Sequence, residues 1–485
     1  MAFTDILRTL NDSLWVCLAT DALLWLLFVA FVVGFIVILR SPLQRAVWRQ
    51  VFRQRLAVVS ALLLAVAATF ALLDSIHFRE PLPASATQSA QASVRYGVEV
   101  RSVLDLLLTG LRRDHEKTYS APLAIHLAAM EPVSVSLPDG GVEVRRESPR
   151  LRVAGQAFPP GPVSTWSYVS DILIRVLSGA AGGLLVFLAL WLPLRAWRRF
   201  RLQRSESKGL PSSPVSRWVA FTLAGVLITG GVLTGLSTNF HVFGTDKVGQ
   251  DVLYQVLKSL RTALIIGLVP TLVTLPIGIV LGLSAGYFRG KVDDVIQYIY
   301  TTVSAIPGVL LIAAAVLSIQ VMIDNHPEWF ATAVERGDIR LLALCIILGM
   351  TSWTGIARLL RGEALRMREY EYVQAARAFG VGAGRILLRH ILPNVFPIIL
   401  ITMVMEFSTL VLAEAVLSYI GIGVDPTMFS FGLMINNARM ELSREPVVWW
   451  SLTAAFLFMV LLVLAANLLA DAVRDALDPR SENRA

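Results

Sequence analysis

The sequence has few cysteines, few histidines and few charged residues for its length. Its 485 residues include two Cys and six His, and charged residues make up 16% of the chain. Cys17 and Cys345 lie in or beside apolar runs, which predicts neither a disulfide nor a metal site. The catalytic signatures GxxxxGK[ST], HExxH and CxxC do not occur. We therefore expect no catalytic residues, no metal and no cofactor in this chain.

Apolar residues are abundant instead. They form 55% of the chain, and the mean hydropathy of +0.64 is typical of an integral membrane protein. The net charge of +8 comes largely from arginines beside apolar runs, so it does not indicate nucleic-acid binding. The first residues, MAFTDILRTLNDSLW, contain acids and lack a basic region before a cleavage site, so we expect no cleaved signal peptide. Residues 1–14 predict a short amphipathic or interfacial helix.

About nine apolar segments are long enough, or nearly long enough, to cross a bilayer, which takes about 20 residues. They are residues 14–39, 56–73, 172–194, 219–236, 262–285, 295–319, 341–356, 395–417 and 451–469. Arginines cluster after the first and third of these segments. Because basic residues favour the cytoplasmic side, the pattern predicts an N-terminus outside and a C-terminus in the cytoplasm.

Residues 75–168 differ from the rest, because no apolar run there is long enough to span. Residues 98–111 have helical periodicity, whereas 133–137 and 142–144 alternate as strands around Pro138-Asp139-Gly140-Gly141. We expect a small α+β extracytoplasmic domain here. It follows N-terminal spans at 1–74, and residues 169–216 then hold the third span and a basic cytoplasmic linker. The remaining membrane domain is 217–485, with a core at about 260–472.

The stretch from 358 to 393 reads RLLRGEALRMREYEYVQAARAFGVGAGRILLRHILP and holds seven arginines against three glutamates. Such a segment between two spans belongs on the cytoplasmic side. Good helix formers precede Gly380, so the pattern predicts a short surface helix, a turn and a second helix that leads into the next span. Ala375 and Ala376 are small enough for another protein to approach closely. The alternative is a solvated loop held at the lipid headgroups by its arginines.

The order of residues in this stretch resembles the EAA loop of bacterial binding-protein-dependent ABC importer permeases. Gln374 stands where that family has Glu, and His390 replaces an apolar residue; the segment 389–394 looks like the dipeptide/oligopeptide branch. In the family the short helix docks into a cleft of the ATPase subunit. The coupling residues that the resemblance implies are Glu371, Gln374, Ala375, Ala376, Phe379, Gly380, His390, Leu392 and Pro393.

Four further segments resemble the same family, so that the resemblance covers about residues 217–480. They are HVFGTDKVGQD at 241–251, GYFRGKVDD at 286–294, AEAVLSYIG at 413–421, and NLLAD with RDALDPR at 467–480. Gln250 stands where Arg is usual. From the residues alone, 241–251 also fits a capped amphipathic helix on the outer surface.

The resemblance implies an all-α type I ABC importer permease fold in the bacterial cytoplasmic (inner) membrane. It implies transport of di- or oligopeptides, with ATP and Mg bound by partner ATPase subunits, a second related permease and an extracytoplasmic solute-binding protein. Nickel or another small solute is an alternative cargo. A secondary transporter or a membrane receptor are alternatives of another class, but neither an internal repeat nor a signalling domain is evident.

Two acids and one proline stand out inside the predicted spans. Glu406 and Glu414 lie in 395–417, where an acid is costly unless it faces protein or water. They are expected either to line the substrate path or to pair with a neighbouring helix. Pro307 lies within 295–319 and predicts a bend. Residues 1–216 are expected to shield the permease flank or to help seat the binding protein.

Overall fold

The computed structural model describes residues 13–40, 42–81, 96–136, 142–158, 163–204, 214–330 and 332–477. Over these ranges nine helical segments are long and apolar enough to cross a membrane, which confirms the predicted number. The helices of these segments are α2 (Ala19–Arg40), α4 (Arg55–Asp74), α8 (Thr165–Arg204), α9 (Pro214–Leu236), α10 (Val252–Leu268) with α11 (Thr271–Phe288), α13 (Gly308–Asn325), α14 (Ala333–Arg368), α17 (Leu392–Ile420) and α19 (Trp450–Leu477).

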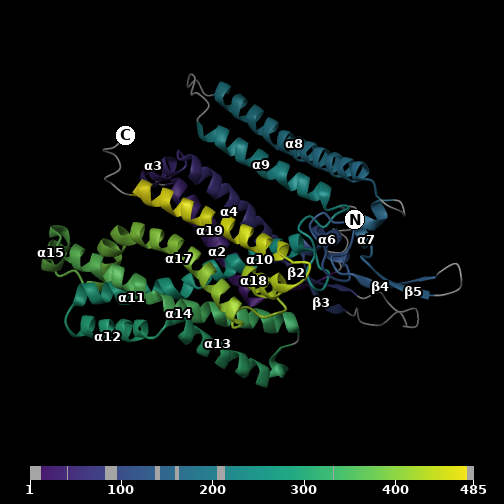
Figure 1. The fold of residues 1–485 in the computed structure, drawn as a ribbon. Coiled ribbons are helices and arrows are strands. Elements are labelled where there is room, and N and C mark those ends of the chain that lie inside the picture. Colours follow the sequence, from purple (N-terminus) through teal and green to yellow (C-terminus); the bar gives the residue numbers. More distant parts are fainter. Residues whose placement is uncertain are drawn as a thin grey trace, which may run out of the picture.

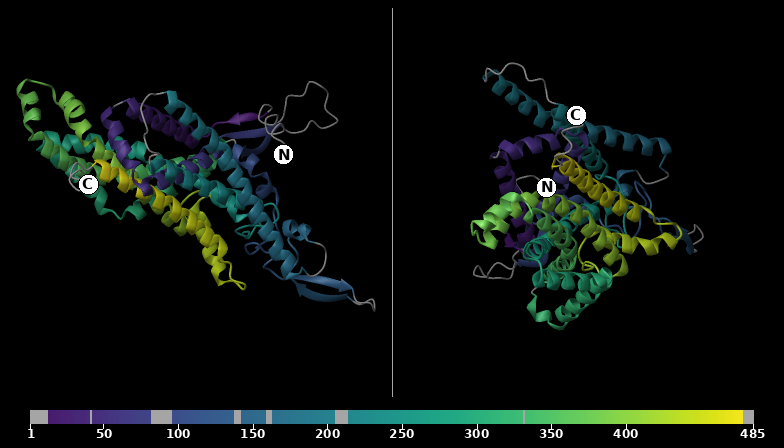
Figure 2. Two further views of the ribbon diagram at one scale, coloured as in Figure 1. Left: turned by 90° about the horizontal axis from the view of Figure 1, so that it is seen from above. Right: turned by 90° about the vertical axis from the view of Figure 1, so that its left-hand side faces the viewer.

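The long helices run side by side along the molecule, and the β-strands lie at one end (Figures 1 and 2). At the opposite end lies a short helix, α15 (Glu371–Ala378). The smaller helices that complete the bundle are α3 (Pro42–Val51), α12 (Lys291–Ala305) and α18 (Phe431–Arg439), with 3₁₀ turns at Pro327–Trp329 and Met440–Ser443.

Several predicted boundaries differ from the structure. Residues 14–16 form strand β1, so the first span begins only at Ala19. The span predicted at 262–285 starts earlier, at Val252, and is divided near Pro270, which has no N–H to donate to the preceding turn. The span predicted at 341–356 extends from Ala333 to Arg368.

Pro307 does not lie within one helix, as was predicted, but separates two. The amphipathic α12 ends at Ala305, and the apolar α13 begins at Gly308. Ile306, immediately before the proline, has extended backbone angles, as expected because the pyrrolidine ring disfavours helical geometry in the preceding residue. Of the two helices, α13 is the one apolar enough to span.

The region predicted as an α+β domain contains a hairpin and two strands of a three-stranded antiparallel sheet, whose third strand, β1, precedes the first span. The sheet has the order β1 (Leu14–Val16), β2 (His77–Pro81), β3 (Tyr96–Ser102), and the hairpin pairs β4 (Glu131–Ser136) with β5 (Val142–Glu147). Short helices α5 (Val103–Leu107), α6 (Thr109–Arg113) and α7 (Arg152–Ala157) complete it.

The strand prediction at 133–137 and 142–144 is confirmed by this hairpin. The helix predicted at 98–111 is wrong in its first part, because 96–102 pairs with β2 and the helix begins only after Ser102. The Ser102 side chain accepts from the Asp105 N–H and forms a capping box, which fixes the helix start there.

Glycines set the closest helix contacts. A Cβ on Gly179 of α8 would lie 2.3 Å from the Gly231 carbonyl oxygen of α9, and one on Gly183 would lie 2.3 Å from that of Leu227. The antiparallel α8–α9 hairpin therefore depends on small residues, as close helix pairs in membranes commonly do. Gly282 of α11 is equally constrained, because its Cβ would lie 2.6 Å from the Ala357 carbonyl oxygen of α14.

Several predictions fall outside the described residues. They concern most of the interfacial helix at 1–14, the turn at 138–141, the Pro-Gly exit at 159–162, the linker at 209–213 and the end of the closing signature at 478–480.

Candidate functional site

The predicted helix–turn–helix order of the Arg-rich stretch is present. Helix α15 ends before Gly380, which has a φ of +77°, a left-handed conformation that glycine adopts without a steric penalty. Then come α16 (Ala383–Ile386), the π-turn Leu387–Ile391 and α17. The arginines at 358, 361, 366 and 368 are not in a loop, since α14 continues as a helix through Arg368.

The inner face of α15 is anchored by apolar contacts. Val373 is 1% exposed and belongs to a buried cluster with residues of α11, α14, the π-turn and α17. Ala376 packs against the same cluster. It therefore faces inward, unlike Ala375, which is exposed. Only one residue of the predicted Ala-Ala pair is thus presented on the outer surface.

Polar contacts hold the ends of the neighbouring helices in place. Arg289, in the turn between α11 and α12, forms a 2.8 Å ion pair with Glu369, whose backbone carbonyl accepts from the Gln374 side-chain amide at 3.2 Å. Arg361 donates to both carboxylate oxygens of Asp293 at 2.6 and 2.9 Å. These hydrogen bonds lower the pKa of Asp293, so the carboxylate stays charged and ties α12 to α14.

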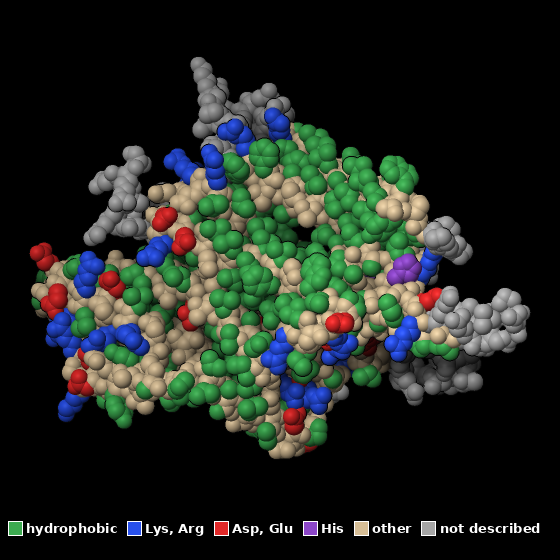
Figure 3. Space-filling model, viewed as in Figure 1, with side chains coloured by type: hydrophobic (Ala, Val, Ile, Leu, Met, Phe, Trp, Pro, Cys, Tyr) green, Lys and Arg blue, Asp and Glu red, His purple; other side chains and the backbone are tan. Residues whose placement is uncertain are grey.

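The outer face of α15 carries mixed polar and apolar side chains. Glu371, Gln374 and Arg377 are exposed, and Phe379 at the end of the helix is 86% exposed. Figure 3 shows charged side chains gathered at this end of the molecule and hydrophobic ones along its middle. A rigid helix that ends in a solvent-exposed phenyl ring is suited to insertion into a groove of another protein.

The remaining predicted coupling residues lie just behind α15. The His390 ring is half-buried, with its centroid 6.4 Å from that of Tyr372. Its carbonyl accepts from the Asn394 side chain at 2.6 Å. Leu392 packs partly into the apolar cluster, while Pro393 is exposed. His390, Leu392 and Pro393 therefore lie on the inner side of α15 and do not extend its outer face.

At the other end of the molecule, the segment 241–251 is bonded to the α+β region. The Thr245 N–H donates to the Ser120 carbonyl at 3.1 Å, and the Ser120 N–H donates to the Thr245 hydroxyl at 2.7 Å. That hydroxyl donates in turn to the Thr118 carbonyl at 2.9 Å. The indole N–H of Trp450 completes the joint by donating to the Thr245 carbonyl. The expected cap is present, because Asp251 accepts from the N–H groups of Leu253 and Tyr254. The prediction that 241–251 itself forms a helix on the outer surface is wrong, since the helix begins at Val252 and belongs to a span.

His241 lies between two carboxylates at this joint. Its Nδ1 is 2.7 Å from Asp251, and its Nε2 is 3.7 Å from Glu116, which the α+β region supplies. Burial alone would lower the pKa of His241, but the hydrogen bond to Asp251 and the negative charges of both acids outweigh it and raise this pKa to about 9. The imidazolium form therefore binds the two parts of the chain together at neutral pH.

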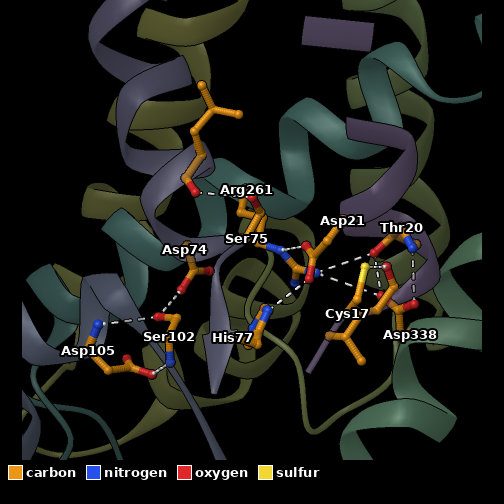
Figure 4. Close-up of polar contacts among 12 residues, drawn as sticks. Cys17, Thr20, Asp21, Asp74, Ser75, His77, Ser102, Asp105, Arg261 and Asp338 are labelled. Carbon is orange, nitrogen blue, oxygen red and sulfur yellow. Dashed lines mark hydrogen bonds and ion pairs between the residues drawn. The ribbon is translucent and has the colours of Figure 1, made fainter. Parts of the chain in front are cut away.

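A buried ionic network lies near the same end, where α2 and α4 meet α10 and α14 (Figure 4). Arg261 of α10 donates to Asp21 of α2 through Nε at 2.9 Å and Nη2 at 2.5 Å, and it lies 3.7 Å from Asp338 of α14. His77 is 2.8 Å from the other Asp21 oxygen, and the Thr20 N–H donates to Asp338 at 3.1 Å. All five side chains are buried.

Lys258, one turn before Arg261 on α10, holds the second half of the network. Its ammonium group lies 3.1 Å from Asp74 at the end of α4 and 2.9 Å from Asp105 of α5. Ser102 donates to Asp74 at 2.6 Å, and Tyr254 donates to Asp105 at 2.7 Å. Burial would raise the pKa of Asp105, but the charge of Lys258 outweighs it and lowers this pKa to about 2. These partners could not be identified from the sequence, in which the only signal was charge within apolar runs.

The two acids of α17 have different surroundings. Glu414 is 2% exposed and accepts from the Ser418 hydroxyl at 2.6 Å. A Cβ on Gly432 of α18 would lie 3.0 Å from its oxygen, so Glu414 packs between two helices. Glu406 instead lines a small cavity between α11, α14 and α17.

A multi-pass helical bundle that presents a rigidly held surface helix at one end has the architecture of a membrane transport subunit. Residues 278–483 match the family model described as "Binding-protein-dependent transport system inner membrane component". The chain is 31% identical to the dipeptide transport permease DppC of Bacillus subtilis, over 50% of this chain and 69% of that protein. It is 34% identical to the glutathione transport permease GsiD of Pectobacterium atrosepticum, over 50% and 73%.

The oligopeptide transport permease OppC of Bacillus subtilis is 30% identical, over 50% of this chain and 72% of that protein. Among solved structures, the methionine ABC transporter MetNI in inward-facing conformations matches with a TM-score of 0.34 and 17% identity, over 47% of this chain and 97% of that chain. The protein belongs to the family of binding-protein-dependent ABC importer permeases, in its dipeptide/oligopeptide branch.

Proposed function

We propose that this protein is one permease subunit of an ATP-driven importer of di- or oligopeptides. A second, related permease completes the path, and an extracytoplasmic solute-binding protein delivers the peptide. ATP and Mg are bound and hydrolysed on partner ATPase subunits. The peptide assignment is supported by the dipeptide and oligopeptide transport described for its relatives.

In this proposal α15 carries movement from the ATPase subunits into the spans. The observation that supports it best is that α15 is fixed on its inner side by Val373 and exposed on its outer side up to Phe379. Moving a gate from 1:99 to 99:1 requires about 5.5 kcal/mol of differential interaction. Burial of one Phe side chain supplies about 1.5–3 kcal/mol, so docking of the whole face and ATP binding together reach the required range.

The proposed orientation of the protein in the membrane follows from the distribution of its basic residues. The α15 end carries the arginines of 358–389, and basic residues favour the cytoplasmic side. The α+β region of 75–168 then lies outside, with the N-terminus outside and the C-terminus in the cytoplasm. The proposed divisions are 1–74, 75–168, 169–216 and a permease domain from 217 to 485. In this protein, 1–216 covers one flank of the permease.

The experiment is purification of the complex with its ATPase subunits. We expect Phe379→Ala to weaken their binding about 10- to 150-fold, the range that corresponds to about 1.5–3 kcal/mol. Phe221→Ala is the matched control, since Phe221 is exposed on α9, away from α15. Undiminished binding in the Phe379 variant would contradict the coupling role. Uptake that continues after ATP depletion would contradict the importer class.

A further inference from the structure

Helix α3 joins the ends of two neighbouring spans, Ala19–Val37 and Arg55–Asp74. It turns into α4 within a few residues, since the Arg53 N–H donates to the Gln50 carbonyl at 3.1 Å. A short helix between the ends of two adjacent spans cannot move far from the bilayer surface. We therefore place α3 at the level of the lipid headgroups.

The inner face of α3 is apolar and already covered by protein. Val51 is 1% exposed and forms a buried cluster with residues at the start of α4 and the end of α19, against which Trp48 also packs. The outward side chains are basic. Residues 40–55 contain five arginines and no Asp or Glu, and all five arginine side chains are exposed. The free side of α3 thus presents positive charge.

Most of these arginines have no acidic partner. The basic surface is the set of exposed arginines near α3 that form no ion pair with an acid in the described part of the chain: Arg40, Arg49, Arg53, Arg55 and Arg217. Arg217 begins the span of α9 and precedes Trp218, and the Arg55 guanidinium group lies over the Trp218 ring at 5.0 Å. The last turns of α19 add Asp471 and Asp475 but also Arg474. Positive charge therefore remains in excess where four spans end.

Exposed apolar side chains follow directly on the membrane side of the arginines. Leu56, next to Arg55, is 59% exposed, and Phe221 is 69% exposed one helical turn after Arg217 and on the same side of α9. Figure 3 shows basic side chains gathered over the neighbouring ends of α3 and α9, with hydrophobic ones beyond them along α8 and α9. This order of charge and then apolar surface matches an amphiphile. A free phosphate or a nucleotide would leave the apolar part unused.

We propose that the basic surface binds the headgroups of anionic phospholipids, on the cytoplasmic side in the orientation given above. The inference goes beyond the proposed function, because no part of it depends on the transported solute. A guanidinium group donates two parallel hydrogen bonds to phosphate oxygens, and basic clusters at the end of a span attract acidic headgroups. Each arginine near an anionic surface contributes a factor of about five in affinity.

The test uses the full-length chain in an uncharged detergent with equal amounts of phosphatidylglycerol and phosphatidylcholine, and native mass spectrometry counts the lipids retained. We expect the unaltered chain to favour phosphatidylglycerol. Arg53→Gln with Arg55→Gln should weaken phosphatidylglycerol binding roughly 25-fold and leave phosphatidylcholine binding unchanged. Arg53→Lys with Arg55→Lys should keep most of the preference, since the charge remains. Arg385→Gln with Arg389→Gln is the control, because it removes the same charge from exposed side chains near α15.

Four results would overturn the lipid site. The first is equal retention of the two lipids by the unaltered chain, and the second is an equal effect of the variant and control pairs. The third is an unchanged preference in the Gln variant, which would show that these arginines only orient the chain during insertion. The fourth is displacement of the lipid by excess glycerol 3-phosphate, which would indicate a site for a soluble phosphate. If the Gln variant loses the ATPase subunits but keeps its lipid, the arginines face a protein instead.

Discussion

Arg261 offers the most quantitative test of how the N-terminal helices are held on the permease core. Replacing it by Met removes the guanidinium group but keeps an apolar side chain of similar reach. Among the described residues, Asp21 would then keep His77 as its side-chain partner, and Asp338 would keep Thr20. Because the Arg261 side chain is 6% exposed and that of each acid is 2% exposed, water cannot readily replace the lost contacts.

Breaking a buried ion pair by removing one partner costs about 3–5 kcal/mol, because a buried charge is left unpaired. That free energy corresponds to a factor of roughly one hundred to a few thousand in the population of the state in which the contact between α2 and α10 is open. We expect this opening to appear as faster amide exchange in α2 and β1–β2, which the network holds, with little change in α17. Lys291→Gln, an exposed cation on α12, is the control.

A triple variant separates charge from packing. Asp21→Asn and Asp338→Asn combined with Arg261→Met leave no formal charge at this point, so most of the lost protection should return. Hydrogen–deuterium exchange followed by mass spectrometry measures all three proteins. Exchange in the Arg261 variant equal to that of the unaltered protein would refute the reasoning, as would a triple variant that opens as readily as the single one.

Two further predictions concern helix packing and pH. Gly282→Leu should lower the melting temperature and the yield of monodisperse protein, because its Cβ would meet the Ala357 carbonyl and introduce about 1–3 kcal/mol of strain. Gly362→Leu is the control and should lower neither, since the space around Gly362 is open. Equal melting temperatures of the two variants would contradict this prediction. The raised pKa of His241, about 9 against an ordinary 6.5, gives stability that is fully present below about pH 6.5 and is lost as the pH rises through 9. Proteolysis near Glu116 should therefore be faster at pH 9.5 than at pH 7, and a His241→Gln variant that keeps the same pH response would contradict it.

Local pattern was sufficient for the spans and for α15. Apolar length predicted nine spans, and the glycine after a run of good helix formers predicted the end of α15 near Gly380. These features depend on residues that are close together in the chain, so a single sequence contains enough information to predict them. Where a partner strand or a proline intervened, the prediction was wrong: 98–111 is partly a strand because it pairs with His77–Pro81, and Pro307 separates α12 from α13.

The contacts between distant segments could not be predicted from pattern. Asp21 and Arg261 are 240 positions apart, and each alone resembles an isolated charge in an apolar run. Only the packing of α2 against α10 makes them partners. The same holds for Glu116 and His241, and for the cavity at Glu406, whose lining residues come from three helices. The coupling role of α15 remains a prediction.

The hydrogen bonds between 116–123 and 241–251 have a practical consequence for anyone who trims this protein. Excising 75–168 would strip the buried Thr245 hydroxyl of its partners and would leave the His241 imidazole with Asp251 but without Glu116. A transport defect in the shortened chain would then report a damaged permease as readily as a lost docking surface. Exchanging exposed side chains at the far side of the domain, such as Arg146 and Glu147 of β5, would separate the two causes while leaving the scaffold intact.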